Sequence, residues 1–192
     1  MYKRILSVIV LLMMLLSLCS CYDENDEDKT EIGAVGSVNG IDITQDEINY
    51  YVKRLRSNVI SKYVNDYGVE YSDDFWNHDV SGTTPEKYLS DSAFDECVMA
   101  KIQLIKCKEY GIYDDIDFSA LKAKAERFNK DNEGKKTVGI TSIDMDVFYT
   151  YYVETGALAL KNKLIENNII NDESEYEQYI DSIVKSADII KK

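Results

Sequence analysis

Apolar residues recur at steps of three and four along most of the chain, which is the spacing of one face of an α-helix. Thr44 is a helix-capping residue, and Glu47, three positions later, completes a capping box. The pattern therefore predicts a helix that begins after Thr44 and ends before Gly68. Its apolar face consists of Ile48, Val52, Leu55, Val59 and Tyr63.

A second helix is expected after a polar loop, because a threonine cap precedes Pro85 in "TTPEKYL" and proline suits a first helical turn. Gly111 is expected as its left-handed cap residue, with Ile112 as the apolar residue after it. The apolar stripe of this helix consists of Leu89, Phe94, Val98, Ile102 and Ile105.

Three further helices are predicted in the second half of the chain. Residues 117–136 form the third, and Thr141 opens the fourth, with Asp144 in the capping position and a kink near Gly156. Asp172 caps the fifth. One face of the third helix carries Leu121, Ala125 and Phe128, and the fifth contains Tyr176, Ile180, Ile183 and Val184.

A small β element is predicted to join the two ends of this helical domain. Asn39-Gly40 is typical of a two-residue hairpin turn, because both turn positions need positive φ. Valines precede this turn, and Ile41 and Ile43 follow it. A lone hairpin is marginally stable, so the closing "SADIIKK" is expected to add a strand to it. The fold class is therefore mainly α, a helical bundle with a small sheet.

The beginning of the chain is typical of a secretory signal. Lys3 and Arg4 precede an apolar run over residues 5–16, which is shorter than the ~20 residues of a membrane-spanning helix. "LCSC" resembles the bacterial lipobox, and the small serine before Cys21 favours that residue over Cys19 as the lipidated one. Two acyl chains would give a stable anchor. The alternative is an ordinary signal peptide with incidental cysteines.

Composition and charge divide the remainder into a tether and one domain. Residues 21–32 are acidic and unpatterned, so we expect a disordered tether, followed by one domain over residues 33–192. The formal net charge is −13, with no basic patch for nucleic-acid phosphates. The expected location is the outer face of the cell membrane, where the lipid anchor contacts the membrane.

No catalytic or metal-binding constellation is present in the sequence. Cys97 and Cys107 are ten residues apart on one predicted helix, a rise of ~15 Å, whereas a disulfide needs Cα atoms within ~7 Å. Both are expected to be reduced and partly buried. His78 is the single histidine, and no CxxC occurs. We therefore expect no enzymatic activity, cofactor or metal.

Tyrosine is abundant, with fifteen residues, and several lie next to each other on predicted helices. Neighbouring aromatic residues on a helix do not all face one core, so some should reach a groove between the first and fourth helices that binds peptides. The alternative is that they are core and boundary residues, and that the loop tryptophan anchors its loop to the core. The candidate peptide-binding residues are Tyr50, Tyr51, Trp76, Phe148, Tyr151 and Tyr152.

Three stretches resemble the SurA/PrsA-type extracytoplasmic chaperone domain: "VNGIDITQDEI", "TTPEKYLSDSAFDECVMAKIQLIKCKEYGI" and "YIDSIVKSADIIKK". The resemblance implies a domain that binds unfolded or newly exported polypeptides. In relatives a parvulin-type prolyl isomerase domain, of about 100 residues, often follows the second helix, but only about 30 residues separate Gly111 from Thr141 here. Isomerase activity is therefore not expected. The alternative function is a scaffolding lipoprotein with one fixed protein partner.

Overall fold

The computed structural model describes residues 33–136 and 138–192. The expected signal peptide, the acidic tether and the predicted lipidation site Cys21 lie outside the described residues. Gly33–Lys192 forms one compact unit that contains the whole described sheet and core. No helix in this unit has the length and apolar content needed to cross a membrane.

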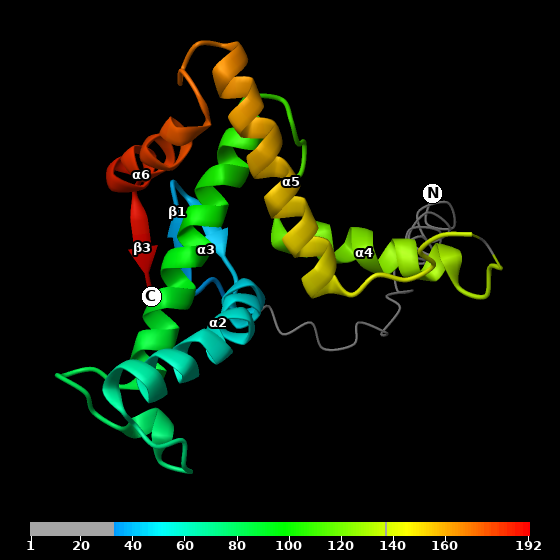
Figure 1. The fold of residues 1–192 in the computed structure, drawn as a ribbon. Coiled ribbons are helices and arrows are strands. Elements are labelled where there is room, and N and C mark those ends of the chain that lie inside the picture. The colour runs from blue at the N-terminus through cyan, green and yellow to red at the C-terminus, as the bar shows by residue number, and fades with distance from the viewer. Residues whose placement is uncertain (1–32, 137) are drawn as a thin grey trace, which may run out of the picture. The chain divides into compact units, whose positions relative to one another are not determined.

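Five α-helices make up most of the described chain, which confirms the predicted mainly helical fold (Figure 1). Short 3₁₀ turns precede the second and the last of them. The helices are α2 (Gln45–Tyr67), α3 (Pro85–Glu109), α4 (Phe118–Asn132), α5 (Met145–Glu166) and α6 (Tyr176–Ser186), and the turns are η1 (Phe75–Asn77) and η2 (Glu173–Glu175).

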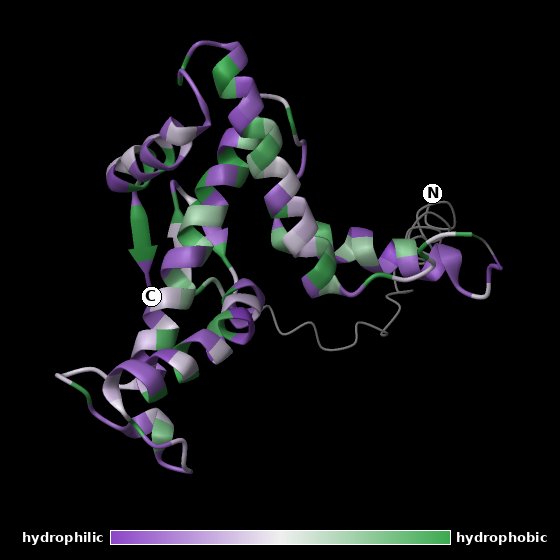
Figure 2. Ribbon diagram, in the orientation of Figure 1, coloured by the Kyte–Doolittle hydropathy of each residue, from purple (hydrophilic) through white to green (hydrophobic). Residues whose placement is uncertain are grey.

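The small sheet joins the two ends of the domain, as predicted. It contains β1 (Gly36–Val38), β2 (Ile41–Ile43) and β3 (Ile189–Lys191), with β1 in the centre and antiparallel to both neighbours (Figure 1). Asn39 and Gly40 have φ values of 50° and 76°, as a two-residue hairpin turn requires. Figure 2 shows β3 as hydrophobic, although its side chains are exposed.

The predicted helix starts for α2 and α3 are confirmed by their capping hydrogen bonds. The Thr44 hydroxyl accepts from the Glu47 N–H at 3.2 Å, and the Glu47 carboxylate accepts from the Thr44 N–H at 3.0 Å. The Thr84 hydroxyl accepts from the Lys87 N–H at 3.1 Å. Gly68 follows α2 in the left-handed conformation, with a φ of 67°.

The segment between α4 and α5 differs from the prediction. α4 ends at Asn132 rather than at residue 136, and α5 begins at Met145 rather than at Thr141. The reason is a pair of hydrogen bonds between the Asn129 side chain and the Ile143 backbone, at 2.7 and 2.9 Å, which hold this stretch in a non-helical connection. Asp144 is nevertheless the cap of α5, as predicted.

The exposure of Phe128 on α4 and the course of α5 at Gly156 also differ from the prediction. Phe128 is 39% exposed, because α4 packs only through its first half, where Leu121 and Ala125 are buried. α5 runs as one helix through Gly156, where a kink was predicted. A Cβ at this position would lie 2.7 Å from the Tyr113 ring and 3.2 Å from the Cys107 sulfur, so the glycine permits close packing.

α3 is the central element of the core and packs against α2, α5, α6 and β1. Its Cys97 and Cys107 are free and fully buried, which confirms that they do not pair with each other. A second buried cluster lies around the far half of α2 and contains Val59, Tyr63 and Phe75. The core thus forms around α3.

Gly36 is a position where only hydrogen fits, and replacing it tests the packing of the sheet on α3. A Cβ there would lie 2.5 Å from the Ile190 carbonyl oxygen and 2.9 Å from the Phe94 ring. We expect Gly36→Ala to cost ~1–3 kcal/mol of unfolding free energy, measured by urea denaturation. Gly33→Ala is the control, since nothing lies within 4 Å of it, and should change stability by less than ~0.5 kcal/mol. Equal midpoints of urea denaturation for the two variants would contradict this packing.

Candidate functional site

A fully buried ion pair connects the helices that surround the candidate site. Glu47 of α2 and Lys101 of α3 have exposed fractions of 0% and 1%, and the Lys101 Nζ donates to Glu47 Oε1 at 2.5 Å. The Tyr149 hydroxyl of α5 also donates to Glu47 Oε1, at 3.4 Å. One carboxylate therefore joins α2, α3 and α5. Because no part of this pair reaches solvent, its role is to position these helices.

Tyr50 and Tyr51, two of the candidate binding residues, lie in the core, which is the alternative considered from the sequence. Their rings pack edge to face at 4.8 Å, and the Tyr50 ring also contacts Tyr149 at 5.0 Å. The Tyr50 hydroxyl forms a hydrogen bond of 2.6 Å with the Thr150 hydroxyl. Burial raises the pKa of Tyr51 and of Tyr149 well above the usual value. These rings fill the α2–α5 interface, and only a small part of Tyr50 and of Tyr51 reaches the hollows beside them.

The three candidate residues on α5 have different surroundings. Tyr152 stacks on Tyr113 at 4.0 Å, donates its hydroxyl to the Asp115 carbonyl at 2.7 Å, and has a pKa raised to about 12, mainly by burial. Phe148 is partly buried against the core. Tyr151 alone among these three points to solvent, with 65% exposure.

Trp76 anchors the loop before α3. Its ring packs edge to face on the buried Phe75 at 5.1 Å, and the Arg56 guanidinium lies 4.3 Å from its ring centre.

The histidine and cysteine side chains that could carry catalysis or bind a metal lie in different surroundings, and the single histidine, His78, is exposed in the loop before α3. Burial raises the pKa of the Cys97 thiol, so this cysteine is a poor nucleophile. The described residues contain no group of three or more His, Cys, Asp or Glu side chains arranged to hold a metal.

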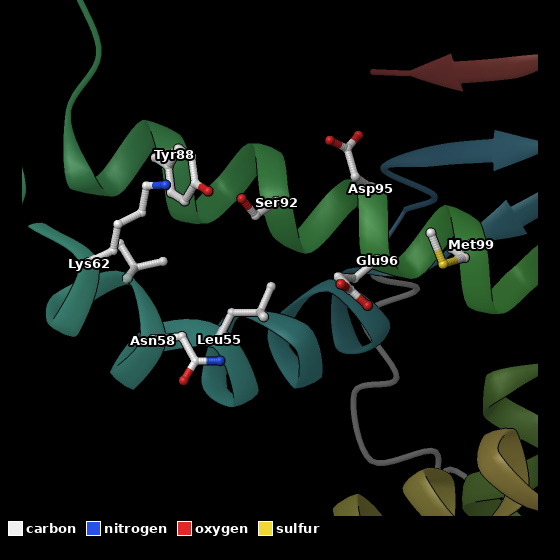
Figure 3. A pocket seen from close by; sticks show the side chains of 9 residues that line it. Leu55, Asn58, Lys62, Tyr88, Ser92, Asp95, Glu96 and Met99 are labelled. Carbon is white, nitrogen blue, oxygen red and sulfur yellow. The ribbon is translucent and has the colours of Figure 1, made fainter. Parts of the chain in front are cut away.

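An open groove of about 310 Å³ lies between α2 and α3 (Figure 3). We call it the α2–α3 groove. Its apolar surface comes from Leu55 and Val59 of α2 and from Tyr88 and Met99 of α3; Met99 is 37% exposed. Polar and charged side chains complete the lining: Asn58, Lys62, Ser92, Asp95 and Glu96. Figure 3 shows Lys62 and Tyr88 at one end and Glu96 and Met99 toward the other.

Two further hollows are lined in part by α2. One of about 170 Å³ shares Glu96 and Met99 with the α2–α3 groove and extends to α5. The other, of about 300 Å³, lies between α2 and α5, where the sequence predicted a groove. Ion pairs from Lys53 to Asp146 and from Arg54 to Glu154 join α2 to α5 there. Among the described residues, no ion pair includes a side chain that lines the α2–α3 groove.

The sequence did not predict the α2–α3 groove, because the residues on the outer face of α3 are those of an ordinary solvated surface. Asp95, Glu96 and Gln103 all lie three or four positions from Met99, so they share its side of the helix. An apolar Met99 outside the stripe of core residues is the signal that could have indicated the groove. Methionine is common at adaptable binding surfaces.

Comparisons with protein-family models, with curated proteins and with solved structures find no match for this chain.

Replacing Lys101 tests whether the buried pair positions the helices. Lys101→Met would leave the Glu47 carboxylate buried without its cation, and we expect a loss of ~3–5 kcal/mol of unfolding free energy. The double variant Glu47→Gln/Lys101→Met should recover part of it, because a neutral amide can still cap α2. Lys87→Met, which removes an exposed pair with Asp91, should cost less than ~1 kcal/mol. Equal losses for the two single variants, measured by urea denaturation, would show that the buried pair has no special role.

Proposed function

We propose that this chain is a membrane-anchored, extracytoplasmic, chaperone-like lipoprotein that binds unfolded or newly exported polypeptides without covalent chemistry. The observation that supports this most is the open α2–α3 groove, whose apolar lining includes the partly exposed Met99. Binding there needs no catalytic group, metal or cofactor. The resemblance of the sequence to SurA/PrsA-type chaperone domains is the second support.

The length of the groove suits a short extended segment. Tyr88 and Met99 are eleven residues apart on α3, which corresponds to about 16 Å along the helix axis. An extended chain rises about 3.3 Å per residue, so about five client residues would fit. Burying a few apolar side chains at ~25 cal/mol per Å² gives modest affinity. Modest affinity suits a protein that must release its clients.

The proposed location rests on the lipobox-like sequence before Cys21. In cells fed a labelled fatty acid, we expect the chain to incorporate the label and Cys21→Ser to lose it, together with membrane attachment. Cys19→Ser is the matched control and should still be labelled. Label retained by Cys21→Ser would contradict this anchor.

The second candidate function is a scaffolding lipoprotein with one fixed partner. Its support is an apolar face on α5, where Val147, Tyr151 and Leu158 are all more than half exposed. Their spacing of four and seven residues places them on one side of the helix. A scaffold would capture one defined protein through this face, whereas a chaperone would bind many unfolded ones through the groove.

Aggregation of a reduced, unfolded client protein tests the preferred function. We expect the purified chain to suppress it, and Met99→Gln to weaken client binding about fivefold, since ~1 kcal/mol of apolar contact is lost. Leu158→Gln is the matched control, because Leu158 is exposed on α5 outside the groove, and it should behave as wild type. Equal aggregation with and without the chain would refute the proposal.

A further inference from the structure

The α2–α3 groove carries two acidic side chains that lack an ion-pair partner in the part of the chain that the structure describes. These are Asp95 and Glu96, which are exposed and line the groove from α3. Other carboxylates nearby are engaged, since Asp91 pairs with Lys87 and Lys191, and Glu154 pairs with Arg54. Negative charge is thus available at this groove.

The positive charge of the groove lies at its other end and is partly engaged. The Lys62 ammonium is 5.1 Å from the centre of the Tyr88 ring, a distance at which a cation and an aromatic face attract each other. Figure 3 shows Lys62 beside Tyr88 and away from Glu96 and Met99. The Met99 end of the groove is therefore both apolar and negative.

We propose that the α2–α3 groove selects apolar segments that also carry a lysine or arginine, with Asp95 and Glu96 receiving the basic side chain. This inference rests on the proposed function, and it names the class of segment that the groove would take. An apolar client residue would contact Leu55 and Met99, which line the groove; Figure 3 shows Met99 toward the same end as Glu96.

The geometry of an extended chain brings the basic residue within reach. Alternate residues of a strand share one face, about 7 Å apart, and lysine and arginine side chains are long enough to bridge that spacing to a rim carboxylate. Glu96 also lines the adjoining hollow toward α5, but the Arg54 guanidinium lines that hollow too, so the α2–α3 groove is the favourable side for a basic side chain to approach Glu96. Because both carboxylates are exposed, salt should weaken this selectivity.

Three labelled peptides of equal length and leucine content test the inference by fluorescence anisotropy; their polar positions are all Lys, all Gln or all Glu. The protein is the chain from residue 22 onward, which retains the complete compact unit Gly33–Lys192. At low salt we expect the Lys peptide to bind about tenfold more tightly than the Glu peptide, with the Gln peptide between them. The ratio should fall as salt is added.

Two double variants of equal charge change decide whether the groove is the source of the selectivity. Asp95→Asn/Glu96→Gln should abolish most of the difference between the Lys and Glu peptides. Glu177→Gln/Asp181→Asn alters two exposed carboxylates of α6 and should preserve the difference. A preference that survives the groove variant, or that both variants reduce equally, would overturn the assignment to Asp95 and Glu96.

The remaining outcomes separate this inference from the function on which it rests. Equal binding of the three peptides to the wild-type chain would refute charge selection and leave polypeptide binding intact. Absence of binding for all three would refute the proposed function and the inference with it. If all three peptides bind, Met99→Gln should weaken the binding of each to a similar degree, because the Met99 side chain makes an apolar contact.

Discussion

The arrangement of this domain depends on the buried pair between Glu47 and Lys101. Charged groups inside a protein are costly unless each finds its partner, so α2 and α3 are held in the one register that brings these side chains together. The Glu47 carboxylate also caps α2 and accepts a hydrogen bond from Tyr149 of α5. A single side chain thereby links the start of α2 to the later part of α3 and to the beginning of α5.

The α2–α3 groove lies between this pair and a second fixed region. At one end of the groove, its lining residue Val59 belongs to a second buried cluster with Tyr63, Phe75 and Leu89. Glu47 near the start of α2 faces the later part of α3, and Lys62 near its end lies over Tyr88 of early α3, so the two helices are antiparallel. The two helices are thus fixed relative to each other at both ends. The α2–α3 groove between them exposes Met99 and the carboxylates of Asp95 and Glu96.

Local sequence signals predicted the elements of this fold, and tertiary contacts decided the rest. The capping box at Thr44 and the Asn39-Gly40 turn follow from short-range chemistry, and each could be predicted from neighbouring residues. The closing strand could be predicted because a lone hairpin is marginally stable and needs a further strand. The partner of Glu47 could not, because a lysine on a helix is ordinarily solvated. Likewise, Tyr50 and Tyr51 are both buried because α2 is covered by α3 and α5 together, which adjacency in sequence does not indicate. The start of α5 was placed too early because Asn129 binds the Ile143 backbone from another helix.

Nuclear magnetic resonance tests most directly whether polypeptides bind in the α2–α3 groove. Methyl groups of the chain would be followed while an unfolded client peptide is added. The account predicts chemical-shift changes at Leu55, Val59 and Met99, with little change at Val147 and Leu158 on the exposed face of α5. Changes confined to the α5 face, with the α2–α3 groove unaffected, would contradict it.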